Sequence, residues 1–135
     1  MPKQFKTPSS AIGHFGAIGI GNMGAAIIRG VAKKLLSNEQ IFVTDVDQTK
    51  VDELCQELGV HAVETVNHLV EKVDVILYSA KPNNVAGILT QVRELVKPNQ
   101  LLISIAAGIP TVKLESYLAE SVPVIRVMPN IAVTV

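Results

Sequence analysis

The sequence has few of the residues on which many small folds depend. It contains a single cysteine, Cys55, so an intramolecular disulfide and a multi-cysteine metal site are both excluded. Aromatic residues make up 4% of the chain and tryptophan is absent, whereas hydrophobic residues make up 48%. The core must therefore consist largely of Val, Ile, Leu and Ala, a composition that suits a parallel sheet buried on both faces.

The chain also has no net charge and no long apolar run. Its 12 basic and 12 acidic residues cancel, so no basic surface argues for a nucleic-acid partner. No apolar run approaches the roughly 20 residues that span a bilayer. Residues 1–10 lack the apolar segment of a signal peptide. We therefore expect a cytoplasmic protein without a membrane partner, with a flexible polar extension over residues 1–10.

Two hydrophobic periodicities alternate along residues 11–135, a length that predicts one domain. Short runs rich in Val, Ile and Leu predict strands at residues 14–18, 41–44, 75–79, 101–105 and 124–127. Apolar spacings of three and four predict helices at residues 22–36, 48–58, 66–72, 84–96 and 111–119. This alternation indicates an α/β fold of the Rossmann type, doubly wound, with a mostly parallel sheet and helices on both faces.

A glycine pattern follows the first predicted strand and opens the first predicted helix: Gly19-Ile20-Gly21-Asn22-Met23-Gly24. In this context G-x-G-x-x-G predicts a dinucleotide-binding loop. Gly19 allows the tight turn, Gly21 lets the backbone approach a pyrophosphate, and Gly24 lets the helix pack closely on the strand. The free N–H groups of the helix N-terminus would then bind the phosphates. The alternative is a purely structural glycine turn.

Asp45 ends the second predicted strand, where Rossmann domains carry an acidic residue that binds the ribose 2′-hydroxyl. In that position it would repel a 2′-phosphate. Two unit charges about 4 Å apart cost roughly 1 kcal/mol in water and about 4 kcal/mol at an effective dielectric constant of 20. The sequence therefore predicts NADH or NADPH as cofactor, with NADH favoured. The alternative is a loop aspartate, or a partner of Asp47 at the start of the next helix.

Three further loops leave the carboxyl ends of predicted strands, the edge at which open α/β sheets bind ligands. Tyr78-Ser79-Ala80-Lys81-Pro82 carries a lysine that either points at phosphate or a substrate carboxylate, or is a solvated surface residue. Small residues at 104–109 either leave room for a ring or only pack closely. Asn130 follows the last strand and can both donate and accept hydrogen bonds. The three histidines share no spacing with acidic residues, so no metal site is expected.

Taken together, these motifs resemble the pyrroline-5-carboxylate reductase family. Residues 15–24, FGAIGIGNMG, are similar to the opening of that family, although β-hydroxyacid dehydrogenases share G-x-G-N-M-G. Three later stretches favour the reductases: VDVI with AKP (residues 73–76 and 80–82), ISIAAGI (103–109) and RVMPN (126–130). Asn67 also falls where that family has an Asn that contacts the cofactor.

The resemblance implies NAD(P)H-dependent reduction of 1-pyrroline-5-carboxylate to L-proline, the last step of proline synthesis. The protein would mainly position the cofactor and the cyclic imine, a small-molecule substrate. The pyrophosphate is expected against Gly19, Gly21, Asn22, Met23 and Gly24. The adenosine and phosphate side is expected against Asp45, Asn67 and Lys81, and the nicotinamide side against Ala80, Pro82, Ala107 and Gly108. Ser79 is also expected to bind the cofactor. Met128, Pro129 and Asn130 are the substrate-side candidates, and no catalytic acid or base is identified.

Three departures from the family pattern limit these expectations. Ile131-Ala132 replace a common Thr-Pro, and Asp45-Val46-Asp47 stand where many members have Ser, Asn or Arg. The family's helical C-terminal domain, which supplies the dimer interface and much of the imine pocket, is absent, which we interpret as a truncation at Val135. We therefore expect a homo-oligomer in the full-length protein and little turnover by this chain alone. A β-hydroxyacid-type oxidoreductase and a non-catalytic nucleotide-binding module remain alternatives.

Overall fold

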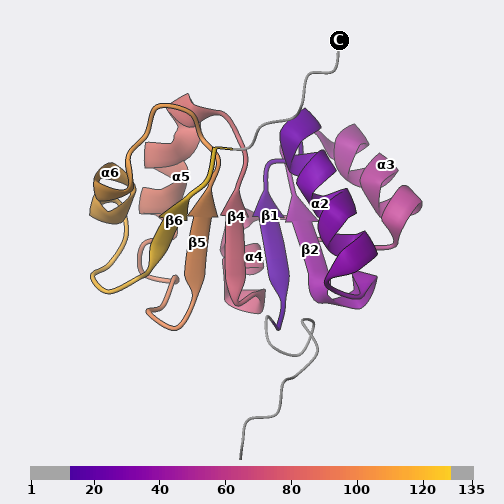
Figure 1. The fold of residues 1–135 in the computed structure, drawn as a ribbon, viewed down its shortest axis with the longest axis horizontal. Coiled ribbons are helices and arrows are strands. Elements are labelled where there is room, and N and C mark those ends of the chain that lie inside the picture. Colours follow the sequence, from indigo (N-terminus) through magenta and orange to yellow (C-terminus); the bar gives the residue numbers. More distant parts are fainter. Residues whose placement is uncertain (1–12, 129–135) are drawn as a thin grey trace, which may run out of the picture.

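The computed structural model describes residues 13–128 of the 135-residue chain. Six strands form one sheet in the order β3-β2-β1-β4-β5-β6, and every neighbouring pair is parallel (Figure 1). The chain begins in the middle of the sheet, proceeds outward to β3, and then crosses to β4 and proceeds outward in the other direction. Parallel neighbours require a crossover segment between successive strands, and here each crossover contains a helix. The predicted Rossmann-type fold is confirmed.

The strands are short, and the three central ones end at the same level of the sheet. Their bounds are β1 (Phe15–Ile18), β2 (Ile41–Thr44), β3 (His61–Ala62), β4 (Val75–Tyr78), β5 (Leu101–Ser104) and β6 (Val124–Arg126). Ile18, the last residue of β1, is paired with Thr44 of β2 and with Tyr78 of β4. The loops that follow these three strands therefore lie side by side. The strand β3 was not predicted, because both of its residues are exposed and form no apolar run.

Five α-helices and two 3-10 helices connect the strands. They are α2 (Asn22–Lys34), η1 (Asn38–Gln40), α3 (Gln48–Leu58), α4 (Val66–Lys72), η2 (Pro82–Asn84), α5 (Val85–Gln91) and α6 (Thr111–Ser116). The predictions for α3 and α4 are confirmed to the residue. The helix predicted at 84–96 is shorter: α5 ends at Gln91 and turns follow it. Val92 and Val96 are nevertheless buried. The apolar spacing therefore identified buried positions correctly, although the backbone there is not helical.

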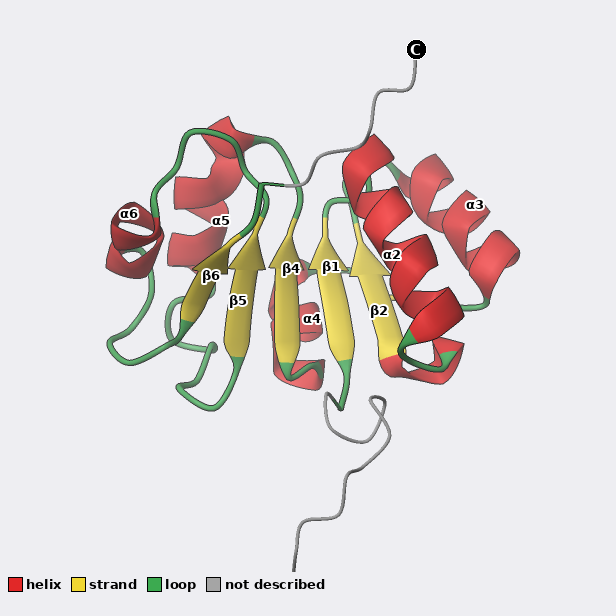
Figure 2. Cartoon of the chain, in the orientation of Figure 1, coloured by secondary structure: helices red, strands yellow, loops and turns green. Residues whose placement is uncertain are grey.

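The two faces of the sheet carry separate hydrophobic cores. Helices α2 and α3 pack over one face, where Ile28 and Leu54 join Ala17 and Val43 of the strands. Helices α4, α5 and α6 pack over the other face, against residues that include Leu102. Figure 2 shows α2 in front of the sheet and α4 behind it. Among residues 13–128, no helix has the length and apolarity that crossing a bilayer requires.

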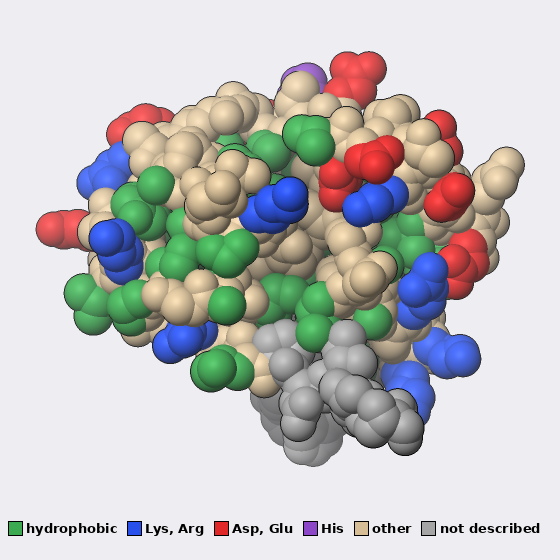
Figure 3. All heavy atoms as spheres, turned by 90° about the horizontal axis from the view of Figure 1, so that it is seen from above, with side chains coloured by type: hydrophobic (Ala, Val, Ile, Leu, Met, Phe, Trp, Pro, Cys, Tyr) green, Lys and Arg blue, Asp and Glu red, His purple; other side chains and the backbone are tan. Residues whose placement is uncertain are grey.

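One part of the sheet surface is left open. In Figure 1 no helix lies in front of β5 and β6, on the side that α2 covers farther along the sheet. Ile125 of β6 is 47% exposed and Val127 is 40% exposed. Their neighbours Ile103 and Ile105 are only partly buried. Figure 3 shows hydrophobic side chains gathered on this side of the molecule.

Candidate cofactor-binding site

The glycine loop between β1 and α2 is tied to both neighbouring strands. The N–H of Gly19 donates to the carbonyl oxygen of Thr44 at 2.9 Å, which joins the loop to β2. On the other side the N–H of Ser79 donates to the carbonyl oxygen of Ile18 at 2.8 Å. The Ser79 hydroxyl donates to the carbonyl oxygen of Gly19. Ser79 was predicted to lie beside the cofactor, and the structure shows its hydroxyl directed at the glycine loop.

The three glycines of the motif stand in different surroundings. Gly19 has φ of +90°, and a Cβ atom there would lie 2.6 Å from the backbone of Ala80. At Gly24 a Cβ atom would lie 2.6 Å from the Ser79 Oγ and 2.7 Å from the Gly19 carbonyl oxygen. At Gly21 a Cβ atom would meet nothing within 4 Å. The fold therefore requires glycine at 19 and 24, whereas Gly21 borders open space.

The N-terminus of α2 opens onto that space. Gly21 is the N-cap residue, no side chain caps the helix, and its first turn contains no acidic residue. By helix geometry the first N–H groups, which include those of Asn22 and Met23, have no acceptor within the helix. They combine with the positive end of the helix dipole to favour an anion such as a pyrophosphate.

Asp45 contacts the glycine loop through its carboxylate. Oδ2 accepts a hydrogen bond from the N–H of Ile20 at 2.7 Å, and Oδ1 accepts one from the N–H of Asp47 at 2.8 Å. Asp47 in turn caps α3 by accepting from the N–H groups of Thr49 and Lys50. The alternative of a link between Asp45 and Asp47 is thus realised, through the backbone of Asp47. Both oxygens of the half-buried Asp45 are engaged by backbone donors.

A cavity of about 200 Å³ lies beside the loop, where the carboxyl ends of β1, β2 and β3 meet α5. Its lining is Ile18, Gly19, Thr44, Asp45, Val46, Glu64, Val66, Ala80, Asn84 and Ile88. Apolar side chains form most of this lining, and its two charged members are both carboxylates. The sequence analysis missed Glu64, Val66, Asn84 and Ile88. The first two follow β3, and no loop was assigned there because that strand has no apolar signal.

A buried tyrosine shapes the turn that faces the glycine loop. The hydroxyl of Tyr78 donates to the carbonyl oxygen of Lys81 at 2.7 Å, and burial raises the pKa of Tyr78 to about 12. The same carbonyl oxygen accepts from the N–H of Asn84 at 3.1 Å, and Pro82 begins η2. The Lys81 side chain is exposed, and its ammonium has no partner in residues 13–128. Its charge is therefore free for a ligand phosphate.

Asn67 lies outside the cavity. Its Oδ1 accepts a hydrogen bond from Nε2 of Gln91 at 2.6 Å, so its side chain joins α4 to α5. Its neighbour Val66 lines the cavity instead. The cavity wall at this point is therefore formed by Val66 and not by Asn67.

Of the residues predicted for the nicotinamide and the substrate, Ala107 and Gly108 follow β5 and Met128 follows β6. Ala107 and Gly108 are exposed, and Gly108 has φ of +77°. Met128 is 74% exposed. Pro129 and Asn130 lie outside the described residues. The small residues at 107 and 108 leave the surface open at this edge of the sheet.

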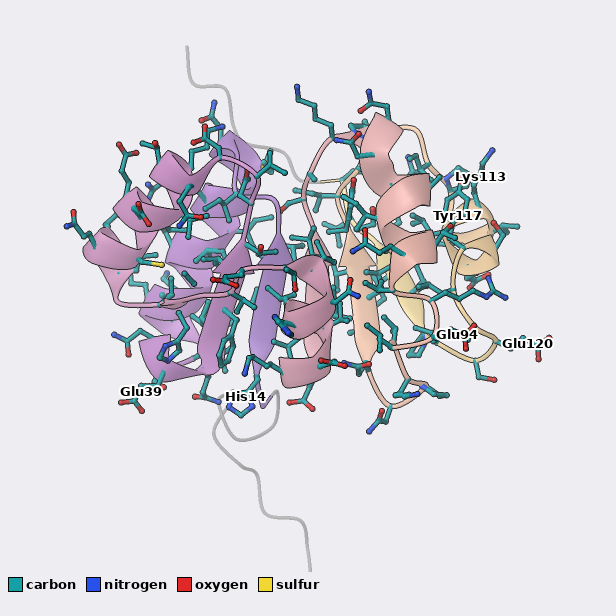
Figure 4. All side chains as sticks on the ribbon, turned by 180° about the vertical axis from the view of Figure 1, so that it is seen from behind. His14, Glu39, Glu94, Lys113, Tyr117 and Glu120 are labelled. Carbon is teal, nitrogen blue, oxygen red and sulfur yellow. The ribbon has the colours of Figure 1, made fainter. Side chains whose placement is uncertain are left out.

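The histidines lie elsewhere. Figure 4 shows His14 at the amino-terminal edge of the sheet. Its backbone N–H donates to Asp74 Oδ2 at 2.8 Å. Phe42 stacks on the His61 ring, with 5.1 Å between the ring centroids. Within the described part of the chain, no three His, Cys, Asp or Glu side chains are grouped to hold a metal ion. The candidate functional site of the described residues therefore lies at the glycine-loop edge of the sheet.

Comparison with known proteins agrees with this geometry. The family model of NADP oxidoreductase, coenzyme F420-dependent, matches residues 14–108. A pyrroline-5-carboxylate reductase of Methanosarcina acetivorans is 35% identical over 121 residues, covering 89% of this chain and 45% of the relative. The solved pyrroline-5-carboxylate reductase of Coxiella burnetii superposes with a TM-score of 0.82 at 26% identity, covering 88% of this chain and 44% of that one.

A solved pyrroline carboxylate reductase of Plasmodium falciparum with NADP bound shares the fold, with a TM-score of 0.76 at 24% identity, over 87% of this chain and 42% of that one. The chain thus spans less than half the length of the relatives it matches. The matched residues 14–108 include the glycine loop, Asp45 and the turn at Lys81. The chain belongs to the family described as NADP oxidoreductase, coenzyme F420-dependent, and the resemblance to pyrroline-5-carboxylate reductases predicted from the motifs is confirmed.

Proposed function

We propose that this chain is the cofactor-binding part of an enzyme that reduces 1-pyrroline-5-carboxylate to L-proline with NADH or NADPH. The observation that carries the proposal is the open space at Gly21, beside the uncapped N-terminus of α2. Gly21 has φ of −65°, which any residue can adopt, and its surroundings would admit a side chain. Neither strain nor packing explains the glycine, whereas the close approach of a pyrophosphate does.

The residues present fit the cofactor. The first N–H groups of α2 and the free ammonium of Lys81 would hold the pyrophosphate, and the apolar walls at Val46 and Ile88 would hold the adenine. When bound, the reduced nicotinamide would supply the hydride that converts the protonated imine to a secondary amine, and the described residues would bind and orient the cofactor and the imine.

NADH is the cofactor that the cavity favours. Asp45 and Glu64 are the charged residues in its lining, and the lining contains no Lys or Arg. A 2′-phosphate placed about 4 Å from one unit charge would lose roughly 1 kcal/mol in water and about 4 kcal/mol at an effective dielectric constant of 20. The family resemblance further implies cytoplasmic residence and assembly of the longer protein into a homo-oligomer, and both belong to this proposal.

Calorimetric titration of the chain with NADH and NADPH tests the binding function. We expect NADH to bind more tightly, and Gly21→Val to weaken binding at least tenfold by filling the approach to the pyrophosphate. Gly30→Val is the matched control, because Gly30 lies in the same helix, is exposed, and has nothing within 4 Å of an added Cβ. No binding of either cofactor, or equal effects of the two variants, contradicts the proposal.

The reaction is tested by a second assay. Oxidation of NADH in the presence of 1-pyrroline-5-carboxylate, with L-proline formed in equal amount, supports the imine reductase. Faster reduction of NAD⁺ by a β-hydroxy acid would instead support an oxidoreductase that acts on a C–OH bond. Binding of NADH without either reaction would agree with a nucleotide-binding module. The same result is expected if turnover needs the half of the relatives that this chain does not match.

A further inference from the structure

The two carboxylates that line the cavity differ in their partners. Both oxygens of Asp45 accept hydrogen bonds from backbone N–H groups, those of Ile20 and Asp47. Glu64 lines the same cavity and is exposed, and its carboxylate has no hydrogen-bond or ion-pair partner in residues 13–128. Asp45 thus already accepts from backbone donors, whereas the Glu64 carboxylate has no partner among the described residues and is free for a ligand.

We propose that Glu64 discriminates between a ribose with a free 2′-hydroxyl and one with a 2′-phosphate, and that Asp45 is a positioning residue for the glycine loop. The inference rests on the proposed function, because both roles require the adenosine end of a dinucleotide in this cavity. The discrimination then belongs to the loop after β3 and not to Asp45, which directly follows β2.

The backbone that carries Glu64 is well fixed. The next residue, Thr65, caps α4 by accepting a hydrogen bond from the N–H of His68 at 3.1 Å, and Val66 forms part of the cavity wall. A free carboxylate can accept hydrogen bonds from ribose hydroxyls. The same carboxylate would place its negative charge beside a 2′-phosphate, in a cavity whose lining has no Lys or Arg to compensate. Glu64 therefore favours NADH in both respects.

Asp45 acts one step away from the ligand. The N–H of Ile20 lies within the glycine loop, and its bond to Asp45 Oδ2 at 2.7 Å directs it away from the phosphate side. Together with the bond from Gly19 to Thr44, it fixes the path by which the chain enters α2. The pyrophosphate, which both cofactors share, depends on that path. Loss of the Asp45 carboxylate should therefore weaken the binding of both NADH and NADPH.

The experiment measures dissociation constants for NADH and NADPH with the full chain and four variants. In Glu64→Gln we expect the ratio of the NADPH constant to the NADH constant to fall about fivefold or more. Glu71→Gln is the matched control, because Glu71 is an exposed glutamate of α4 that does not line the cavity, and it should leave the ratio unchanged. Asp45→Ala should raise both constants. Asp45→Asn, which keeps one acceptor oxygen, should restore part of the loss.

Amide hydrogen exchange separates the two roles. Exchange at Ile20 and Asp47 should become faster in Asp45→Ala and stay unchanged in Glu64→Gln, because only the first variant removes their acceptors. If the ratio of the NADPH to the NADH dissociation constant shifts in Asp45→Asn and not in Glu64→Gln, the inference is overturned and the proposed function stays intact. Failure of the unmodified chain to bind either cofactor would overturn the proposed function and this inference with it.

Discussion

The hydroxyl of Tyr78 and the carbonyl oxygen of Lys81 are joined by a hydrogen bond of 2.7 Å that closes the turn after β4. Tyr78 is completely buried, and its burial raises the pKa of its phenol to about 12. The phenol therefore remains a neutral donor at any physiological pH. Because the turn also carries Ala80, which lies against Gly19, this bond links the core of the sheet to the wall of the cofactor site.

Replacement of Tyr78 by Phe should destabilise the fold by roughly 0.5–1.5 kcal/mol, the net value of one hydrogen bond. The effect should depend on pH. The unfolded phenol ionises near its ordinary pKa of 10.0 and the folded one near 12, so ionisation increasingly favours the unfolded state between these values. The stability that this group contributes is therefore complete below pH 10 and is lost as the pH rises towards 12. Urea unfolding at several pH values should show the wild-type advantage over Tyr78→Phe decrease across that window.

Tyr117→Phe is the control for this measurement, because Tyr117 is only partly buried, at the end of α6, and its hydroxyl donates no hydrogen bond among the described residues. It should change the unfolding free energy little. An advantage of the wild type over Tyr78→Phe that stays constant from pH 9 to pH 12 would contradict the assigned burial of the phenol.

Gly24→Ala should destabilise the protein by roughly 1–3 kcal/mol, the usual cost of forcing extra volume into a packed site. The added Cβ would lie 2.6 Å from the Ser79 Oγ and 2.7 Å from the Gly19 carbonyl oxygen. Gly30→Ala, in the same helix, should instead stabilise it by about 0.5–1 kcal/mol through helix propensity. Thermal unfolding of the two variants checks the difference. Equal melting temperatures would show that α2 can shift away from Ser79 without cost.

Gln100→Ala should reduce stability by roughly 1–3 kcal/mol, because it leaves buried backbone groups without partners. Gln100 is buried, and its Nε2 donates to the carbonyl oxygens of Val70 at 2.7 Å and Val73 at 2.6 Å. Its Oε1 accepts from the N–H of Lys97 at 2.7 Å. Since Gln100 precedes β5, at the amino-terminal edge of the sheet, NADH affinity should not change.

Asn99→Ala, an exposed neighbour, serves as the control for the loss of a side-chain amide. Denaturant unfolding and NADH titration on both variants distinguish stability from binding. A similar loss of stability in the two variants would argue against a structural role of the Gln100 hydrogen bonds.

Self-association of the chain should occur through the open face of β5 and β6. Ile125 and Val127 are 47% and 40% exposed, and partly buried Ile103 and Ile105 continue the apolar surface. Ile125→Lys should therefore lower the average mass measured by light scattering at high concentration. The control is Val112→Lys on α6, where Val112 is 74% exposed. A chain that remains monomeric at all concentrations would contradict this expectation.

The loops at the carboxyl ends of the strands show how far pattern reading extends. The glycine motif and Asp45 were found because each follows a strand with a clear apolar run. Glu64 was missed because it follows β3, whose two residues are exposed and leave no such signal. Asn67 was assigned to the cofactor by resemblance, yet its side chain binds Gln91 of α5 and Val66 lines the cavity. On a helix, a shift of one residue turns the side chain by about 100°, which is enough to change its partner.

The sequence by itself determined the glycine loop and the order of the α-helices and of every strand except β3, because these depend on neighbours a few residues apart along the chain. Only the tertiary structure decided which polar groups remain free for a ligand. Asp45 meets Ile20 across 25 positions and Ser79 meets Gly19 across 60, and no local pattern encodes such pairs. They arise because parallel strands bring the ends of β1, β2 and β4 to one edge of the sheet. There a backbone N–H or carbonyl oxygen is either satisfied by a group distant in sequence or left for a ligand.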